Sequence, residues 1–450
     1  MSSEEATQFP KEYEEIRERI IERLEKRKPQ EAYSILLTVL DYPMKFDDEV
    51  VFKDALTLFE KIARKISGQE LGDLVKDTIE NINNIQVLFD LSYELFEEHQ
   101  HGLAATLLSR ANRLEPQDAL IVPELVSNLE ELMMNGEARK ILLEAKDLLD
   151  ESELCRYLLA YNSLMTGDLE EPFEILQTLQ DVKDENMVPI VESFGGILNR
   201  ARYLKEARTL DNKDLRGWHA VLNGSLLLHC SPFGDDSMNG RYAYMSDSYS
   251  LCREGIERVG KVIQEAGINI PCIYSLKNRS SKILALATSE LLGIPLKQWN
   301  GDSEPGLIVV YDIEEIESDD TIIQIADHRL GQILWVHASC WTYPFPFSPD
   351  ITTFLYQMKI TPWEGSMIYD KEAKNVRQAD PDESPVEEIA NNIKNAVKDE
   401  SYLEDLKDIL TIVNELKELK DEPSMLGIFK SQERRNRQRI GSPVPSNRFL

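Results

Sequence analysis

Residues 85–118, with the sequence IQVLFDLSYELFEEHQHGLAATLLSRANRLEPQD, carry the pattern that decides the fold of the first half of the chain. Within this stretch Ala104, Leu108 and Ala111 are spaced i, i+4 and i+7, which places them on one face of an α-helix. Pro116 follows that helix and is expected to end it. The stretch therefore predicts two short helices joined by a turn, with small alanines where the second helix approaches the first.

The same positions recur at intervals of 34 residues further along the chain. Five series share this register: Ala104, Ala138 and Pro172; Leu108, Leu142 and Leu176; Ala111, Ala145 and Leu179; Leu91, Leu125 and Leu159; and Leu114, Leu148 and Val182. A fixed interval of this length is typical of repeat architectures. Because a repeat that cannot bury its apolar face alone must stack on its neighbours, we expect a superhelix with a concave surface.

In length and composition these units resemble tetratricopeptide (TPR) repeats. The three units span about residues 85–118, 119–152 and 153–186. The first unit has the alanines and the proline of that family, whereas Ser92, Val126 and Ala160 stand at its glycine position and Pro172 replaces the packing alanine of the third unit. The resemblance implies a TPR-like α-solenoid, for which we predict residues 1–212, and a protein or peptide partner in its groove.

The pattern changes over residues 213–370, where strands and helices alternate. Strands are predicted at about 270–276, 295–299, 306–312 and 332–336, and helices at about 247–266, 280–292 and 320–329. The strands lack an apolar-polar alternation, which indicates a mostly parallel sheet covered on both faces. We therefore predict a multidomain chain of class α plus α/β, with this α/β domain following the helical array.

The start of that domain contains two further features. Residues 219–222 and 226–229 flank Asn223-Gly224, which predicts a β-hairpin on an Asn-Gly turn. The loop 231–241 is rich in turn formers and contains Asp235 and Asp236, two possible ligand carboxylates. The alternative is that this loop is a long surface connection.

The C-terminal part is predicted to begin with a linker at residues 371–385. Two amphipathic helices are expected within residues 386–420, and a basic, disordered tail over residues 421–450. The tail carries six Lys and Arg residues against one acidic residue, Glu433, between Lys430 and Leu450. It could contact an acidic partner or the acidic body of the chain, and together with the two helices it could mediate self-association.

Composition limits the classes of function. The formal net charge is −30, so the field of the whole protein repels nucleic acid and anionic lipid, and nucleic-acid binding is not expected. No apolar run is long enough for a membrane span, and the N-terminus lacks the features of a signal peptide. The five scattered cysteines contain no CxxC pair, which fits buried thiols in a reducing compartment. We therefore expect a cytoplasmic protein without a membrane partner.

The first candidate site lies where the predicted strand 270–276 gives way to a helix. It consists of Lys277, Asn278, Arg279, Ser280, Ser281 and Lys282. Free backbone N–H groups and the helix dipole favour an anion at such a place, and three cations and two hydroxyls add to this preference. The segment therefore predicts a phosphate or carboxylate site. The alternative is an exposed turn in which Ser280 caps the helix.

The second candidate is Asp312, at the end of the buried strand 306–312. Ligands of open α/β sheets bind beyond the carboxyl ends of the strands, so a basic loop and a carboxylate there could hold a phosphosugar or nucleotide. The order of strand, acidic end and helix is similar to that of phosphoribosyltransferases, but no glycine or threonine of that family's phosphate loop precedes Thr321. The alternative is that Asp312 caps a turn.

Cysteine and histidine side chains offer a third possibility. His229 with Cys230, and His337 with Cys340, could form a zinc site, but their spacing is not a recognised ligand pattern. Buried thiols and hydrogen-bonded imidazoles are the alternative, and neither a metal nor a cofactor is predicted. The sequence contains no GxSxG, GxxxxGKS, GxGxxG or HExxH motif.

Two functions remain open from the sequence. The first is an interaction scaffold or regulatory adaptor that binds a protein or peptide through its repeats, with an α/β domain as a second surface. The second is a nucleotide- or phosphosugar-binding enzyme of phosphoribosyltransferase type, active or inactive, with regulatory repeats. Whether Lys277, Arg279, Asp312 and the loop 231–241 lie together in space distinguishes the two.

Overall fold

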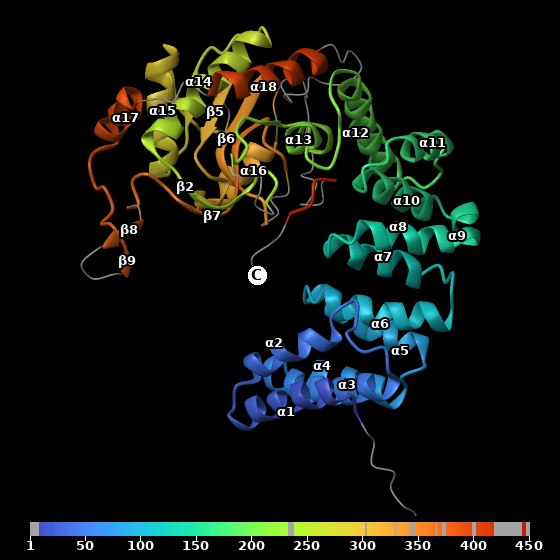
Figure 1. Cartoon of the computed structure of the whole chain (residues 1–450). Coiled ribbons are helices and arrows are strands. Elements are labelled where there is room, and N and C mark those ends of the chain that lie inside the picture. The colour runs from blue at the N-terminus through green and yellow to red at the C-terminus, as the bar shows by residue number, and fades with distance from the viewer. Residues whose placement is uncertain are drawn as a thin grey trace, which may run out of the picture. The chain divides into compact units, whose positions relative to one another are not determined.

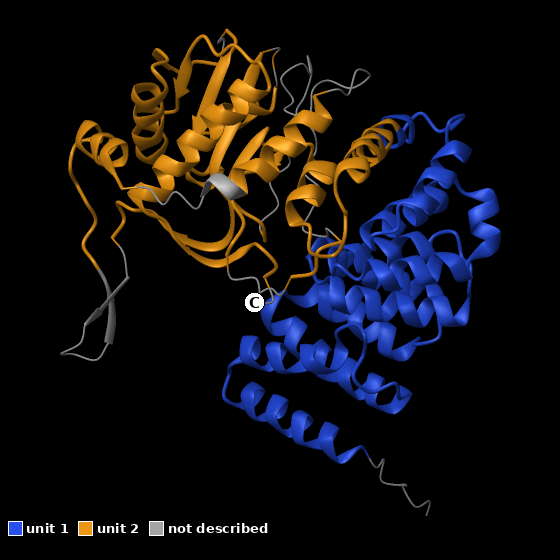
Figure 2. Ribbon diagram, turned by 45° about the horizontal axis from the view of Figure 1, so that its top comes forward, with its two compact units in different colours: residues 1–191 blue, residues 192–450 orange. Residues whose placement is uncertain are grey.

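The computed structural model describes residues 9–232, 238–301, 304–327, 329, 331–342, 347–365, 367–370, 375–397, 402–417 and 443–446. The chain divides into two compact units, residues 1–191 and 192–450 (Figure 2). The boundary falls inside a single helix, α12 (Val188–Ala207).

The first unit is a succession of helices that pack in pairs along the chain (Figure 1). They are α1 (Lys11–Glu25), α2 (Pro29–Leu40), α3 (Glu49–Ile66), α4 (Gln69–Glu80), α5 (Ile85–Glu97), α6 (His101–Leu114), α7 (Ile121–Glu131), α8 (Asn135–Glu144), α9 (Lys146–Glu151), α10 (Glu153–Met165) and α11 (Glu170–Thr178). Side-chain caps start several of them: Asp48 accepts from the backbone of Val50 and Val51 at α3, and Ser152 accepts from Cys155 at α10.

The 34-residue interval falls on equivalent helices. Leu91, Leu125 and Leu159 are buried in α5, α7 and α10, the first helices of three successive pairs. Ala104, Ala138 and Pro172 are buried in the second helices, α6, α8 and α11. One predicted series is wrong, because Leu114 is exposed at the end of α6 whereas Leu148 is buried in the additional short helix α9.

A polar contact also repeats at this interval. Nδ1 of His101 lies 3.3 Å from Oδ1 of Asn128, and Nδ2 of Asn135 donates to Oδ1 of Asn162 over 3.0 Å. The residues of the second contact stand 34 positions after those of the first. Each contact joins the start of a second helix to the first helix of the next pair. Stacking between pairs is therefore specified by buried and half-buried polar groups as well as by apolar side chains.

The second unit contains a parallel β-sheet with helices against it. Its elements are α13 (Leu215–Asn223), β1 (Leu226–Leu227), β2 (Tyr242–Ser246), α14 (Tyr249–Glu265), β3 (Ile273–Ser275), α15 (Arg279–Leu292), β4 (Leu296–Gln298), β5 (Gly306–Val310), the 3-10 turn η1 (Ile313–Glu315), α16 (Asp319–Ala326), β6 (Gln332–Cys340), β7 (Ile351–Ile360), β8 (Met367–Asp370), β9 (Asn375–Gln378), α17 (Val386–Asn395) and α18 (Tyr402–Leu416). The strand order is β1-β7-β6-β5-β3-β4, and β2 also pairs with β7, further along that strand.

All seven strands of this sheet run parallel, as the sequence predicted. On one face, Ile308, Val310, Leu334 and Val336 pack with Ile325 of α16. The opposite face receives α14, whose Gly255 lies against His337 of β6. Helices therefore cover both faces, and the strands are buried throughout β5 and β6.

The predicted hairpin on Asn223-Gly224 is wrong. Residues 215–223 form the helix α13, and Gly224 ends it in the left-handed conformation, with φ 57° and ψ 32°. An Asn-Gly pair serves a helix C-terminus as well as a hairpin turn, because glycine adopts a positive φ without steric cost. The apolar residues Trp218, Val221 and Leu222, at helical spacing, select the helix.

Two strands of the parallel sheet were not predicted, β2 and β7. The ten residues of β7, ITTFLYQMKI, pair with β6 on one side and with β1 and β2 on the other. Strand β6 also continues to Cys340, beyond the predicted end at residue 336. The predicted linker, 371–385, contains β9, which pairs with β8 in a separate antiparallel ribbon.

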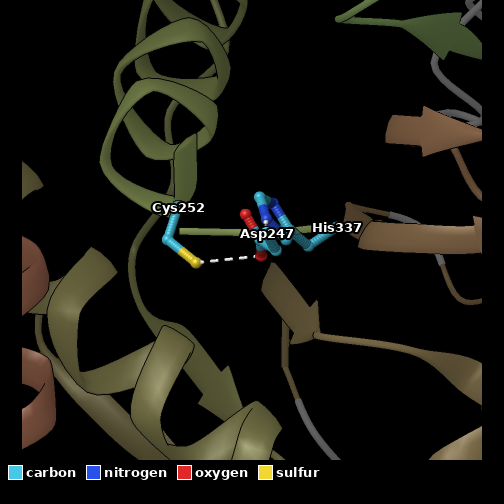
Figure 3. Close-up of side chains that lie close together, drawn as sticks. All are labelled: Asp247, Cys252 and His337. Atoms are coloured by element: carbon cyan, nitrogen blue, oxygen red, sulfur yellow. Dashed lines mark hydrogen bonds and ion pairs between the residues drawn. The ribbon is translucent and has the colours of Figure 1, made fainter. Parts of the chain in front are cut away.

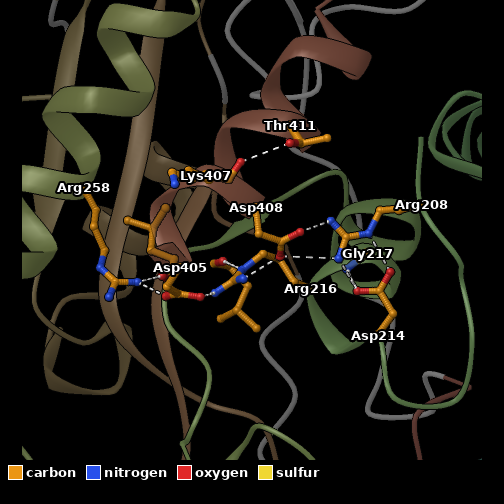
Figure 4. A network of polar contacts seen from close by, with 11 residues as sticks. Arg208, Asp214, Arg216, Gly217, Arg258, Asp405, Lys407, Asp408 and Thr411 are labelled. Atoms are coloured by element: carbon orange, nitrogen blue, oxygen red, sulfur yellow. Dashed lines mark hydrogen bonds and ion pairs between the residues drawn. The ribbon is translucent and has the colours of Figure 1, made fainter. Parts of the chain in front are cut away.

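The C-terminal helices belong to the core of the second unit. Helix α17 packs on α14 and α15, and α18 packs on α13 and α14. Asp405 and Asp408 of α18 accept from arginines of three other segments (Figure 4). Arg216 donates to both aspartates over 2.6 Å, Arg208 donates to Asp408 over 2.9 Å, and Arg258 donates to Asp405. The predicted tail, 421–450, lies outside the described residues apart from 443–446.

Candidate functional site

The sheet topology identifies one place where ligands of open α/β sheets bind. Strand β3 lies between β4 and β5, so the chain moves from β3 to one side and then returns to the other. The segments that follow β3 and β5 therefore diverge at the carboxyl edge of the sheet, which is the topological switch point of such folds. Both segments that the sequence singled out, 277–282 and Asp312, begin at these two strands.

The two serines at the start of α15 are buried and hydrogen-bonded within the protein. Nε1 of Trp363 donates to Oγ of Ser280 over 3.1 Å. The backbone N–H of Tyr311 donates to Oγ of Ser281 over 3.0 Å. The ring of Trp363 also packs edge-on against the ring of Tyr311, with centroids 5.0 Å apart. Trp363 therefore fills the switch point between the ends of β3 and β5.

Arg279 binds to the chain itself. Its Nη2 donates to the carbonyl oxygens of Asp382 and Ser384 over 2.7 and 2.9 Å. The hydroxyl of Tyr249 donates to the carboxylate of Asp382 over 3.1 Å, and the N–H of Asp382 donates to the carbonyl of Trp363. The segment that precedes α17 is thereby held against the start of α15, over the predicted anion site.

The remaining residues of that site differ in exposure. Lys277 and Lys282 are exposed. Asn278 is the N-cap residue of α15, yet its side chain makes no capping hydrogen bond. Both polar atoms of its amide are buried and have no hydrogen-bond partner among the described residues. A buried amide without partners is uncommon, because its desolvation is not offset.

Asp312 is buried and engaged on the other side of the strand. Its carboxylate caps η1 by accepting from the N–H of Glu314 over 3.0 Å. The same carboxylate lies 3.2 Å from Nζ of Lys359 and accepts a hydrogen bond from the hydroxyl of Tyr356. Burial raises the pKa of Asp312 to about 6, against the opposing effects of Lys359 and Tyr356. The alternative role that the sequence left open, a turn cap, is the one that its contacts show.

Asp312 and the serines of α15 do not meet. Ser281 accepts from the backbone N–H of Tyr311, whereas the carboxylate of Asp312 contacts Lys359 and Tyr356 of β7. The other two predicted carboxylates, Asp235 and Asp236, lie outside the described residues.

The structure brings together a buried cluster that the sequence did not single out (Figure 3). Asp247, which follows β2, accepts at Oδ2 from the Tyr311 hydroxyl over 2.7 Å and from Sγ of Cys252 over 3.2 Å. Nε2 of His337 lies 3.1 Å from the same oxygen. Oδ1 accepts from the N–H of Ser248 over 2.7 Å. All these side chains are buried, so hydrogen bonds from the protein stabilise the carboxylate.

The protonation of the cluster follows from burial. Burial and the nearby Asp247 raise the pKa of the Cys252 thiol and of the Tyr311 hydroxyl well above their ordinary values, so both groups are donors at neutral pH. Burial opposes the ionisation of Asp247, but His337 and the hydrogen bonds of His337 and Tyr311 hold its pKa below the ordinary value. The arrangement is one carboxylate surrounded by donors.

The same cluster could also hold a metal ion by the type of its ligands. One ligand atom each of Asp247, Cys252 and His337 lies within 4.8 Å of the others, and carboxylate, thiolate and imidazole are zinc ligands. However, metal-bound histidines usually donate their second nitrogen to a partner, and Nδ1 of His337 has none among the described residues. The hydrogen-bonded arrangement of the four side chains therefore accounts for the cluster without an ion.

The zinc site considered from the sequence used different residues. His229 contacts the hydroxyl of Tyr242 over 3.2 Å, and Sγ of Cys340 lies 3.4 Å from Oγ1 of Thr342. Among the described residues, only His337 of that set belongs to the group with metal-ligand spacing. Asp247 and Cys252 lie five positions apart, but His337 comes from β6, 90 positions after Asp247, so no local motif could have indicated all three.

The first unit contains a pocket of about 250 Å³ between the segment that joins α2 to α3 and helix α6. Its lining comprises Tyr42, Pro43, Met44, Asp47, Asp48, Glu49, Phe52, Thr106, Ser109, Arg110 and Arg113. Its two arginines are paired within the unit, Arg110 with Glu49 and Arg113 with Asp47, both over 2.9 Å. The pocket thus offers apolar surface together with two arginines and three carboxylates.

Comparisons with known proteins give no assignment: no family model matches the chain, and no curated protein has a significantly similar sequence. Among the helices that the structure describes, none combines the length and the apolar character needed to cross a bilayer.

Proposed function

We propose that the chain is an interaction scaffold or regulatory adaptor whose helical array binds a peptide segment of a protein partner. The observation that carries the proposal is the polar contact between successive helix pairs, made by His101 with Asn128 and again, 34 residues later, by Asn135 with Asn162. Equivalent contacts at a fixed interval are the mark of stacked repeats. Stacked helix pairs present an extended surface that serves recognition rather than chemistry. The helix pairs, their interval and their alanines support a TPR-like identity for the array.

The pocket beside α6 is the place where we expect the peptide to dock. Tyr42, Met44 and Phe52 supply apolar surface, while the salt bridges of Arg110 and Arg113 leave no large excess of either charge. We therefore expect an apolar side chain of the peptide to enter the pocket, with polar contacts at its rim.

A random-peptide display selection on the full chain tests the proposal. Ser109 lines the pocket, so Ser109→Trp should fill it, whereas Ser34→Trp makes the same change at an exposed position of α2. We expect selection of peptides with a shared apolar motif that bind the wild type and the Ser34→Trp chain and lose at least tenfold in affinity for Ser109→Trp. Selection of no shared motif, or equal binding by Ser109→Trp, would remove the pocket from the proposal.

The second unit supports binding rather than catalysis as its role. The place where ligands of such sheets bind is filled by Trp363 and covered by the segment bound to Arg279. The candidate carboxylate Asp312 is engaged by Lys359 and Tyr356. We therefore propose that the α/β unit adds a second interaction surface.

One observation favours the alternative function, a unit that binds a phosphorylated small molecule. The amide of Asn278 is buried without partners at the N-terminus of α15, where an anion is favoured. Thermal shifts with nucleotides and phosphosugars test this alternative. Stabilisation of the wild type by several degrees, lost in Lys277→Ala/Asn278→Ala, would support it, and equal or absent shifts in both would count against it.

A further inference from the structure

The C-terminal residues 443–446, Pro-Val-Pro-Ser, dock on the second unit although no described residue lies between them and Lys417. The side chain of Val444 is 1% exposed, which is the burial of a core residue. Nη2 of Arg241 donates to the carbonyl of Val444 over 3.2 Å. Nδ2 of Asn239 donates to the carbonyl of Pro445 over 2.6 Å.

The surface that receives the segment is the end of the loop that the sequence marked as a site loop. Arg241 is 3% exposed, and its guanidinium lies over the ring of Trp341, 5.2 Å from the centroid. Met238 is buried beside it, and its carbonyl accepts from Oγ of Ser446 over 3.4 Å. Side-chain donors thus meet successive carbonyls of the segment, while its valine is buried.

The receiving loop is fixed by its own contacts. Asn239 and Gly240 adopt positive φ angles of 47° and 92°, and the carbonyl of Gly240 accepts from the N–H of Ser231 over 2.8 Å. A Cβ atom at Gly240 would lie 3.1 Å from Leu215 of α13, so the turn is packed directly on that helix. A loop held in this way is preorganised for a ligand, which lowers the entropic cost of binding.

The segment is suited to be that ligand. Proline fixes its own φ and restricts the preceding residue to extended conformations, so Pro443 and Pro445 reduce the freedom that docking must remove. Extended proline-containing peptides bind other proteins in this manner, through aromatic-lined sites and donors to their carbonyls. Asn239 and Arg241 supply the donors here, and the ring of Trp341 supports the guanidinium of Arg241.

We propose that residues 238–241, with Arg241 supported by the ring of Trp341, form a recognition site for an extended Pro-Val-Pro-Ser peptide, and that residues 443–446 are its resident, exchangeable occupant. The site lies within the second unit and is independent of the pocket proposed for the helical array. The segment occupies it in cis, so a free peptide of the same sequence has to compete with the tethered one.

The test uses the full chain with the resident segment displaced. Val444→Asp places a charge in the buried valine position and should open the site, whereas Val397→Asp makes the same change where the side chain is 86% exposed. A fluorescently labelled peptide of residues 441–450, GSPVPSNRFL, is titrated against each chain, and its anisotropy is measured.

We expect saturable binding of the peptide to the Val444→Asp chain, at least tenfold weaker binding to wild type and to Val397→Asp, and no binding of a peptide that itself carries the aspartate. Adding Asn239→Ala to the Val444→Asp chain should weaken binding several-fold, because one hydrogen bond to the peptide is lost. A chain that ends at residue 442 serves as a second opened form. Failure of both opened forms to bind the peptide would overturn the recognition site. Equal binding by the wild type would overturn occupancy in cis.

Discussion

Asn162 of α10 donates a hydrogen bond of 2.6 Å to the carboxylate of Glu130 on α7. The same asparagine accepts from Asn135, so Glu130 stands beside one of the two repeated contacts between helix pairs. Burial raises the pKa of Glu130 to about 7, partly offset by the hydrogen bond from Asn162. We therefore expect the stability of the junction between these helix pairs to depend on pH near neutrality.

The first prediction concerns this pH dependence. A carboxyl group whose pKa is raised by folding binds more protons in the folded state, so its destabilising effect is absent below pH 4.5 and complete above pH 7. Glu130→Gln keeps an acceptor for Asn162 and should raise the free energy of unfolding at pH 8 by about 1–3 kcal/mol, but not at pH 4. Urea denaturation at both pH values measures the difference, with Glu97→Gln, at an exposed position of α5, as control. A benefit of the same size at pH 4 would contradict the assignment.

The second prediction concerns the aspartates of α18. Asp405→Asn would leave Arg216 and Arg258, which are 7% and 3% exposed, without their shared carboxylate. Because removing a carboxylate from two buried cations is costly even where other contacts stay, we expect a loss of about 3 kcal/mol in the free energy of unfolding. Lys407→Gln alters charge on the exposed side of the same helix and should change little. Denaturant titration of both variants tests this, and equal stability would refute the role of the network.

A pH dependence of opposite sign follows for Asp405. Burial opposes its ionisation, but Arg216 and Arg258 hold its pKa below the ordinary value. The stabilisation is therefore present above the pKa of an unfolded aspartate and is lost as the pH falls through the lower, folded value. Between pH 6 and pH 3, wild type should lose more stability than Asp405→Asn. Parallel curves for the two chains would show that the aspartate does not contribute.

The third prediction concerns the donors around Asp247. Tyr311→Phe removes the hydroxyl that donates to its carboxylate over 2.7 Å, in a buried site. We expect a loss of about 1–3 kcal/mol in stability, because hydrogen bonds to a buried charged group are stronger than neutral ones. Tyr244→Phe, at a residue that is 45% exposed, is the matched control. Comparable thermal denaturation of the two variants would argue against a stabilising cluster.

The fourth prediction concerns Trp363 at the switch point. Trp363→Ala removes the ring that packs on Tyr311 and the donor to Ser280, so we expect faster amide hydrogen exchange at residues 276–282 and 380–385. Exchange in α18 should stay unchanged and serves as an internal control. Unchanged exchange at both segments would show that Trp363 does not hold the cover in place.

The helical array was predictable because its signal is local and repeated. Each series, such as Leu91, Leu125 and Leu159, reports the same packing environment, so a single interval reveals the pairing of helices. The alternation of strands and helices in the second unit could also be predicted, because a strand such as β5 is a continuous apolar run between turn residues.

Other features depended on contacts that a linear pattern does not contain. Asn223-Gly224 suits a hairpin and a helix end equally, and only the packing of Trp218 decides between them. The β-branched and aromatic run of β7 was a usable signal that the prediction left out. By contrast, Asp247 and His337 are 90 positions apart, and the residues that flank each of them do not indicate that the two side chains meet.

The position of α18 has a practical consequence for shortened versions of the protein. This helix supplies counter-charges to Arg208, Arg216 and Arg258, which precede their partners by 147 to 200 positions. A chain that stops before Tyr402 would remove these carboxylates from the buried Arg216 and Arg258 and leave Arg208 with Asp214, and a fragment beginning after Arg216 would lack two arginines of the same network. The arginines of the second unit therefore gain these counter-charges only when α18, the last described helix, is in place. During synthesis we expect the unit to complete its folding only after that helix has left the ribosome.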